Sequence, residues 1–327
     1  MRVMKWMVFA VLALVIGGIG GARLAALYGE SSNAEALAPA TGRYVEADGL
    51  KLFVQEKGPA NGPAVIFISG TLAWSETWRN TIDPLADAGF HTIAIDLPPF
   101  GFSERPAPDG YGPANHARRI AAVLDALKIQ KAVLVGHSFG GGATVETAFL
   151  HEDRVRGLVL VDAALGLLSP KPGGKGALGW LLAWRPLRTV ISSATFANPA
   201  LTGKGLRDFI ADDSKATDAK LATYKRPLGV IGTSEAVGDW LAGDLFAYPE
   251  GAAMKEDKRY SSFKPPVLII WGKIDDVTPL AQGEDLAKRF AASKLVVLDG
   301  VNHIPHLENP EAFNTALLDF LKSLPTQ

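Results

Sequence analysis

Residues 132–150, AVLVGHSFGGGATVETAFL, contain the strongest structural signal in the chain. A short apolar run, typical of a buried strand, leads directly into the motif Gly136-x-Ser138-x-Gly140, and a helix-compatible segment follows. An element of this kind holds its serine on a sharp, strained turn with the hydroxyl exposed. The five-residue motif is weak by itself, but in this context it predicts that Ser138 is a nucleophile rather than an ordinary turn residue.

Apolar strand candidates alternate with helical patterns on both sides of this element. The later strand candidates are continuously apolar, as expected for parallel strands that helices cover on both faces. This order predicts an α/β fold with a mostly parallel central sheet. The expected strands are Arg43–Ala47, Leu52–Lys57, Ala64–Ser69, His91–Asp96, Ala132–Gly136, Gly157–Asp162, Val267–Trp271 and Leu295–Leu298, and the expected helices lie around Ser75–Ala88, Pro113–Leu127, Gly140–His151, Leu280–Ala292 and Pro310–Leu324.

The alternation stops once, because residues 164–261 contain no convincing strand. This stretch opens with the Gly- and Pro-rich run SPKPGGKG and then carries Trp and Phe residues on helical patterns, with no evident cluster of charges. It is expected to be a helical lid inserted into the α/β core. The expected organisation is an N-terminal anchor or signal segment at 1–28, a linker at 29–42, a core at 43–163 and 262–327, and the lid at 164–261.

Composition excludes several classes of protein. The 327 residues include 33 Lys and Arg against 34 Asp and Glu, for a net charge of −1, and there is no Cys. A protein that binds nucleic acid by neutralising phosphates normally has a basic excess, so no nucleic-acid partner is expected. Without Cys there are no disulfides, no thiolate metal ligands and no Cys nucleophile. No cluster of His and carboxylates has metal-ligand spacing, so no metal is expected.

The N-terminus carries a membrane signal. Arg2 and Lys5 precede residues 6–22, a run of 17 residues without a charge, which is at the short end for a spanning helix of about 17 to 25 residues. The only well-formed signal-cleavage pattern, Ala36-Leu37-Ala38, lies well beyond the run, so an uncleaved anchor with a translocated, periplasmic or extracellular body is favoured. Secretion after signal cleavage is the alternative. The sequence carries no signal for the oligomeric state.

A serine hydroxyl needs a base, and the base needs a carboxylate to orient it. Asp275 follows the buried strand expected at 267–271, and His303 follows the strand expected at 295–298. Both therefore fall where loops leave the carboxyl ends of parallel strands, which is the edge where open α/β sheets build their sites.

Four motifs, in order, resemble the α/β-hydrolase superfamily, in its capped branch of esterases, ring-cleavage C–C hydrolases, haloperoxidase-like enzymes and epoxide hydrolases. They are SGT at 69–71, DLPPFGFS at 96–103, GHSFGG at 136–141, and WGKIDDVTP at 271–279 paired with GVNHIPHLENPEAF at 300–313. Together they bracket nearly all of the chain beyond the linker. The resemblance implies an α/β-hydrolase fold with an inserted helical lid, and a reaction that requires no cofactor.

The resemblance also implies site residues: Ser138 as nucleophile, Asp275 as acid, His303 as base, and the backbone N–H groups of Thr71 and Phe139 as an oxyanion hole. Branches with an aspartate nucleophile are disfavoured, because a serine stands at that position. The chain departs from the family where Ser69-Gly70 replaces the usual His-Gly, and where DLPPFG replaces DLPGFG.

Three residues compete with these assignments. Asp276 could orient the base instead of Asp275, although spacing to Pro279 favours Asp275. Asp162 ends an expected strand after which some family members place their acid, and His306 follows His303 by three positions. His137 neighbours the nucleophile and is expected to have a structural role.

The most direct functional expectation is a serine hydrolase that cleaves a small or medium apolar carboxylic ester through an acyl-enzyme on Ser138. An alternative is C–C bond hydrolysis of a ring-cleavage-type diketone, for which Arg185, Arg188 or Arg226 of the lid could bind a carboxylate. A further alternative, from outside the enzymes, is a ligand-binding protein with a hydrolase fold.

Overall fold

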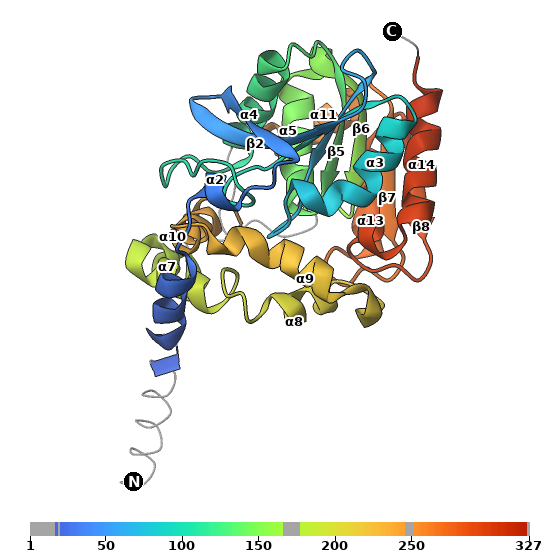
Figure 1. Ribbon diagram of the computed structural model, residues 1–327. Coiled ribbons are helices and arrows are strands. Elements are labelled where there is room, and N and C mark those ends of the chain that lie inside the picture. The colour runs from blue at the N-terminus through green and yellow to red at the C-terminus, as the bar shows by residue number, and fades with distance from the viewer. Residues whose placement is uncertain (1–16, 19, 166–176, 246–250, 326–327) are drawn as a thin grey trace.

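A computed structural model describes residues 17–18, 20–165, 177–245 and 251–325 (Figure 1). Within these residues an eight-stranded sheet has the order β1-β2-β4-β3-β5-β6-β7-β8. β2 is antiparallel to both of its neighbours, and all the other pairs are parallel. The strands are β1 Gly42–Ala47, β2 Leu50–Lys57, β3 Ala64–Ile68, β4 His91–Ile95, β5 Ala132–His137, β6 Val155–Val161, β7 Val267–Gly272 and β8 Ser293–Leu298.

Helices cover both faces of the sheet, because alternate residues of each buried strand point to opposite sides. Ile66 and Ile68 of β3 pack on the side of α4, α5 and α12, whereas Val65 and Phe67 pack on the side of α3 and α14. Each face thus has its own apolar core. The helices are α3 Arg79–Asp87, α4 Pro113–Ala126, α5 Phe139–Leu150, α12 Leu280–Arg289 and α14 Pro310–Ser323, with the short helices α11 Asp257–Ser262 and α13 Pro305–Glu308.

The expected strands and core helices are confirmed, with differences of one or two residues at the ends of the strands and of up to four at the ends of the helices. The strand expected to begin at Leu52 begins at Leu50, because β1 and β2 form a tight hairpin in which Ala47 pairs with Leu50. The two loop residues, Asp48 and Gly49, have φ angles of 53° and 72°. An Asp-Gly pair with positive φ at both positions is the favoured two-residue hairpin turn, and its twist matches that of the strands.

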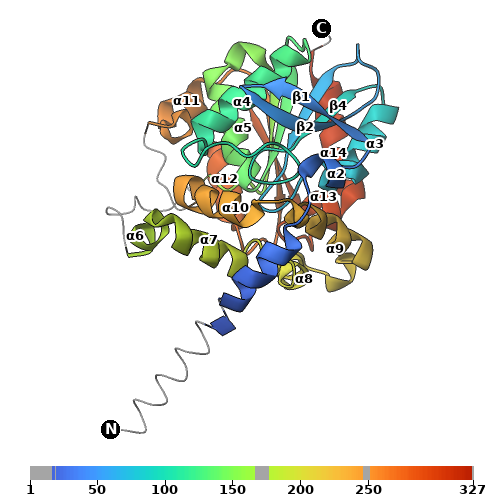
Figure 2. The same cartoon turned by 60° about the vertical axis from the view of Figure 1, so that its left-hand side comes forward.

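Helices also occupy the insertion between β6 and β7, which lies at one edge of the sheet (Figures 1 and 2). Its Val237 and Trp240 pack against Phe100 and Tyr111 of the core. The insertion therefore covers the edge from which Ser138 emerges. Besides α11, its described helices of five or more residues are α6 Ala177–Ala183, α7 Arg185–Ala194, α8 Thr202–Asp208, α9 Asp218–Lys225, α10 Thr233–Trp240 and a π-helix at Leu241–Leu245.

The N-terminal membrane expectation covers residues 1–28, of which 1–16 and 19 lie outside the described residues. A helix occupies residues 20–29, and α2 follows at Ala34–Leu37. Among the residues that the structure describes, no helix combines the length and the apolarity needed to cross a membrane.

The fold predicts at which positions a shorter side chain lowers the free energy of unfolding. Ile269 of β7 is fully buried between the helices, so Ile269→Ala should lower the free energy of unfolding by about 2 to 5 kcal/mol. Val297 of β8 is exposed, and Val297→Ala should change it by less than about 0.5 kcal/mol. Urea denaturation followed by circular dichroism measures both values. Equal losses in the two variants would contradict this assignment of the core.

Candidate active site

Ser138 sits between β5 and α5, at the sharp turn that its motif predicts. Its φ and ψ of 50° and −123° are a strained combination for a residue with a side chain, and a hydrogen bond from its N–H to the carbonyl of Val161 (3.0 Å) holds it. Gly70 packs directly against it, since a Cβ on Gly70 would lie 2.9 Å from the Ser138 Cβ. Only glycine therefore allows the loop after β3 to approach this closely.

Two further loops bring His303 and Asp275 to Ser138. His303 Nε2 lies 2.8 Å from Ser138 Oγ, and His303 Nδ1 donates to Asp275 Oδ2 at 2.9 Å. All three side chains are buried. The residues expected as nucleophile, base and acid thus form one continuous hydrogen-bonded chain, in which the imidazole can accept the serine proton while the carboxylate holds its tautomer.

Asp275 is held as a carboxylate. Its Oδ1 accepts the N–H groups of Val277 and Thr278 at 2.8 and 2.9 Å, and its Oδ2 accepts the Thr278 hydroxyl at 2.7 Å. Burial alone would raise its pKa, but the hydrogen bonds from His303, Asp162 and Thr278 lower the pKa to about 2. Asp276 instead uses its backbone N–H to bond the side chain of Asn302 at 3.2 Å, and its carboxylate is exposed.

Asp162, the alternative acid, lies behind Asp275. Its Oδ1 accepts the N–H of Gly272 at 2.8 Å, and its side chain is fully buried. Burial, followed by the hydrogen bond and the negative charge of Asp275, raises the pKa of Asp162 well above its usual value. A protonated Asp162 donates to Asp275, so it supports the acid rather than replacing it.

Asp162, Asp275 and His303 also form the one group of possible metal ligands among the described residues, with a ligand atom of each within 4.8 Å of the others. A carboxyl that keeps its proton and an imidazole nitrogen that already donates to Asp275 are poor metal ligands. The arrangement therefore fits a hydrogen-bonded chain better than a metal centre.

Two other histidines support the site from below. His137 Nε2 donates to the backbone carbonyl of His303 at 2.7 Å, and burial followed by the nearby His303 lowers the pKa of His137 to about 3. His306 stacks on Trp78 with ring centroids 4.0 Å apart, and Trp78 Nε1 donates to Ser69 Oγ at 3.1 Å. This bond holds the loop in which serine replaces the family's usual histidine. The competing base, His306, is therefore a packing residue.

Glu308 is a supporting residue that the sequence argument missed. Its carboxylate accepts the N–H groups of Asn302 and Ile304, which flank His303, at 3.1 Å each. It also accepts the N–H of Ala211 from the insertion at 2.7 Å. The residue lies inside the quoted motif GVNHIPHLENPEAF, but nothing in one sequence reveals that its partners are backbone groups.

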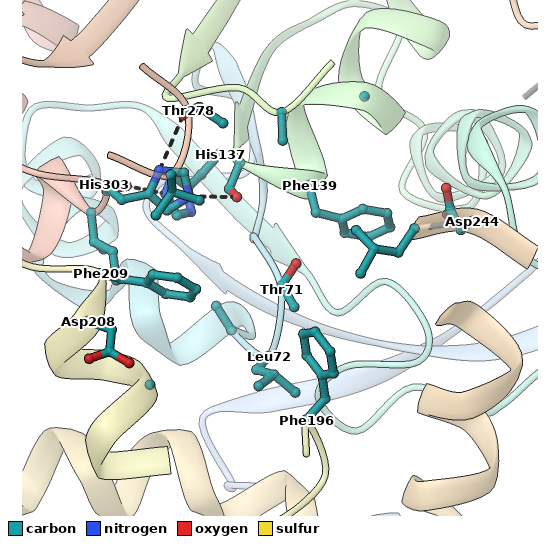
Figure 3. A pocket seen from close by; sticks show the side chains of 18 of the residues that line it. Thr71, Leu72, His137, Phe139, Phe196, Asp208, Phe209, Asp244, Thr278 and His303 are labelled. Atoms are coloured by element: carbon teal, nitrogen blue, oxygen red, sulfur yellow. Dashed lines mark hydrogen bonds between the residues drawn. The ribbon is translucent and has the colours of Figure 1, made fainter. Parts of the chain in front are cut away.

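A cavity of about 830 Å³ opens beside Ser138, between the sheet edge and the insertion. Thr71 and Phe139 both line it, and Phe139 is the first residue of α5, where backbone N–H groups lack partners within the helix (Figure 3). The lining is mostly apolar, with Leu72, Phe196 and Phe209 near the site, and it also includes polar residues such as His116 and Asp244, whose side chains lie 3.1 Å apart.

The arginines proposed for carboxylate binding are engaged elsewhere. Arg185 and Arg188 both donate to the buried Asp239, at 3.0 and 2.6 Å. Arg226 donates to the carbonyl of Leu37 at 2.7 Å. None of the three lines the cavity. The expectation that the lid carries no cluster of charges is also wrong, because residues far apart in its sequence meet in this ion-pair group.

A mostly parallel sheet with a serine at the β5–α5 turn and a His–Asp pair on neighbouring loops defines the class of α/β hydrolases. The family model for the alpha/beta hydrolase fold matches residues 63–310, so the chain belongs to this family and is a hydrolase. Its match spans the sequence motifs from Ser69-Gly70-Thr71 through His303.

The similar proteins are named for different substrates. A 2-hydroxy-6-oxononadienedioate/2-hydroxy-6-oxononatrienedioate hydrolase of Burkholderia vietnamiensis (strain G4 / LMG 22486) is 29% identical over 291 residues, which are 86% of this chain and 96% of the relative. The solved structure of a meta-cleavage product hydrolase from Pseudomonas fluorescens IP01 matches with a TM-score of 0.69 and 26% identity, over 86% of this chain and 98% of that one. That of an N-acyl homoserine lactone degrading enzyme matches with a TM-score of 0.64 and 29% identity, over 85% and 99%.

The protonation of Asp162 has a measurable consequence for stability. Because its pKa is raised in the folded state, wild type loses stability as the pH rises from the unfolded value near 4 to the folded value, by about 1.4 kcal/mol per pH unit. Asp162→Asn keeps a donor of the same shape and removes this titration. Urea denaturation from pH 4 to 8 should show the asparagine variant gaining on wild type as the pH rises. A difference that does not change with pH would contradict a protonated Asp162.

Proposed function

We propose that this chain is a serine hydrolase that works through an acyl-enzyme on Ser138. The observation that carries the proposal is the unbroken chain Ser138–His303–Asp275, with both contacts of the imidazole at 2.8 and 2.9 Å. A serine hydroxyl is a poor nucleophile until a base within hydrogen-bond reach accepts its proton, and this geometry supplies that base.

In the proposed reaction, Ser138 Oγ attacks a substrate carbonyl while His303 takes its proton. The backbone N–H groups of Thr71 and Phe139 stabilise the oxyanion, which in related chemistry is worth about 3 to 4 kcal/mol per donor. His303 then protonates the leaving group as its bond to the carbonyl carbon breaks. A water, deprotonated by the same histidine, hydrolyses the acyl-enzyme. Asp275 remains ionised throughout and stabilises the imidazolium.

For the substrate we place C–C bond hydrolysis of a ring-cleavage-type diketone first, ahead of the ester reading that the sequence alone favours. The support comes from the relative of Burkholderia vietnamiensis and the solved meta-cleavage product hydrolase, both aligned over 86% of this chain. The same three residues serve this reaction, because a ketone carbonyl accepts the serine and the departing carbon is protonated by the histidine. Lys204 and Lys255 also line the cavity, where Lys204 pairs with Asp208 at 2.5 Å and Lys255 donates to the carbonyl of Leu165 at 2.7 Å.

Hydrolysis of an apolar carboxylic ester or lactone is the second candidate. It is favoured by the engagement of Arg185, Arg188 and Arg226 outside the cavity, which leaves a largely apolar lining near Ser138. The matched enzyme that degrades N-acyl homoserine lactone acts on a compound that contains a cyclic ester. A ligand-binding role without catalysis has less support, since the nucleophile, base and acid are all present and in contact.

We also propose that residues 164–261 act as a lid over a core formed by 43–163 and 262–327. The lid's position over the cavity supports this division, and so does the bond from Ala211 in the insertion to Glu308 beside His303. Movement of the insertion would therefore reach the catalytic loop directly.

Loss of the nucleophile tests the mechanism. Ser138→Ala should reduce kcat by at least about 1,000-fold, because the residual rate rests on the oxyanion hole and binding alone. A fluorophosphonate probe should label wild type, and mass spectrometry should place the label on Ser138. Thr144→Ser is the matched control, because Thr144 carries a buried hydroxyl on α5 that takes no part in the hydrogen bonds of His303. This variant should still be labelled. Equal turnover by wild type and Ser138→Ala would refute the mechanism.

Substitution of each carboxylate in turn tests whether Asp275, rather than Asp276 or Asp162, is the acid. Asp275→Asn should lower kcat by about 10,000-fold, because the amide favours the wrong imidazole tautomer. Asp276→Asn and Asp162→Asn should each stay within about tenfold of wild type. The measurement is kcat for p-nitrophenyl esters across pH 6 to 9. A large loss of kcat confined to Asp162→Asn would identify Asp162, which follows β6, as the acid.

A paired substrate series distinguishes the two candidate reactions. We expect kcat/KM for a 2-hydroxy-6-oxo-dienoate, followed by loss of its absorbance, to exceed that for p-nitrophenyl butyrate and hexanoate. Ser138→Ala provides the background for both. Faster turnover of the esters, or no turnover of the dienoate, would make the ester reading correct while leaving the acyl-enzyme mechanism intact.

A further inference from the structure

The helix at residues 20–29 is attached to the insertion by its inner face. Arg23 forms an ion pair with Glu235 of α10, and Ala26 is buried. Directly after the helix, Glu30 Oε1 accepts the backbone N–H of Ser234 at 3.0 Å and also the hydroxyl of the same residue. These bonds fix the helix against α10, so its orientation relative to the insertion is defined.

The outer face of this helix is apolar and exposed. Leu24, Leu27 and Tyr28 are 59%, 56% and 84% exposed. Their spacing of three and four residues places them on one side of the helix, away from the contacts with α10. Polar bonds hold the opposite side of the helix against α10. Among the described residues, no other element covers this apolar stripe.

Two exposed tryptophans lie on the insertion to which this helix is attached. Trp180 of α6 is 75% exposed, and Trp184, the extended residue between α6 and α7, is 64% exposed. The other described tryptophans, Trp74, Trp78, Trp240 and Trp271, are all buried. In both views the N-terminal helix runs past α7, which follows α6, and projects away from the sheet on the insertion side (Figures 1 and 2).

We propose that these five residues, Leu24, Leu27, Tyr28, Trp180 and Trp184, form a lipid-contacting face that rests on a bilayer surface. Tryptophan and tyrosine prefer the membrane interface, where the ring is buried and the polar group remains hydrated, and leucines on a helix flank insert beside them. Wide exposure of such side chains in water is otherwise unfavourable.

Two features favour lipid over a second copy of the chain. The sequence that leads into the helix, residues 6–22, is uncharged for 17 residues and is flanked by Arg2 and Lys5. Such a run is suited to hydrocarbon, and cations beside it suit lipid phosphates. The stripe continues this run on the same chain, so one apolar environment accommodates both.

The test uses full-length protein with vesicles of phosphatidylcholine and phosphatidylglycerol, with and without bromine on the acyl chains. Bromine quenches tryptophan only at short range, so it reports contact of individual rings with lipid. A Trp6→Phe background removes the tryptophan of the N-terminal run. Wild type in this background should be quenched, and Trp180→Phe/Trp184→Phe should lose at least half of the quenching, because the remaining tryptophans are buried.

Vesicle flotation tests the helix stripe. Leu24→Ser/Leu27→Ser/Tyr28→Ser should weaken vesicle binding at least about tenfold, given the apolar area removed. Leu150→Ser is the matched control: it changes an exposed leucine at the far end of α5 and should bind as wild type. Circular dichroism and urea denaturation establish that the variants fold.

Three outcomes would overturn the proposal. The first is unchanged quenching when Trp180 and Trp184 are replaced, and the second is equal vesicle binding by the stripe variant and the Leu150→Ser control. The third is a dimer, seen by sedimentation without lipid, that the stripe variant dissociates while the wild type shows no quenching. None of these measurements uses turnover, so they stand or fall independently of the proposed reaction.

Discussion

The two hydrogen bonds of His303 are the constraint on which the rest of the site depends. They join Ser138 and Asp275 from three different loops, and each heavy-atom distance must stay below about 3.2 Å for proton transfer. Parallel pairing of β5, β6, β7 and β8 meets this requirement, because it brings the carboxyl ends of these strands to one edge. The buried strands β5 and β7, packed between two layers of helices, then hold that edge in place.

The buried ionisable groups around these hydrogen bonds differ in their charge states and in what they hold. Asp275 is kept charged by hydrogen bonds, whereas Asp162 is kept neutral by burial and by the charge of Asp275 beside it. His137 is kept neutral and donates to the His303 carbonyl, and Glu308 binds the N–H groups on either side of His303. One histidine is thus fixed at its side chain and at its backbone by different residues.

The insertion joins this site to the rest of the molecule. It lines the cavity, contacts the catalytic loop through Ala211 and Glu308, and is tied to the N-terminal helix through Arg23 and Glu235. A group of ion pairs around Asp239 holds its helices together. These contacts connect the exposed N-terminal helix to the catalytic edge through packed elements, although they lie far apart in sequence.

The amino-acid sequence by itself determined the strands, the class of fold and the positions of Ser138, Asp275 and His303. The strands and the turn at Ser138 follow from local patterns, namely apolar periodicity and a serine motif whose glycines permit close approach. Asp275 and His303 are implied by the resemblance to the α/β-hydrolase superfamily. Only the tertiary structure decided that Asp162 supports the acid and that Glu308 holds the histidine loop. Their roles depend on burial and on backbone partners supplied by distant segments, and a linear pattern contains no record of either.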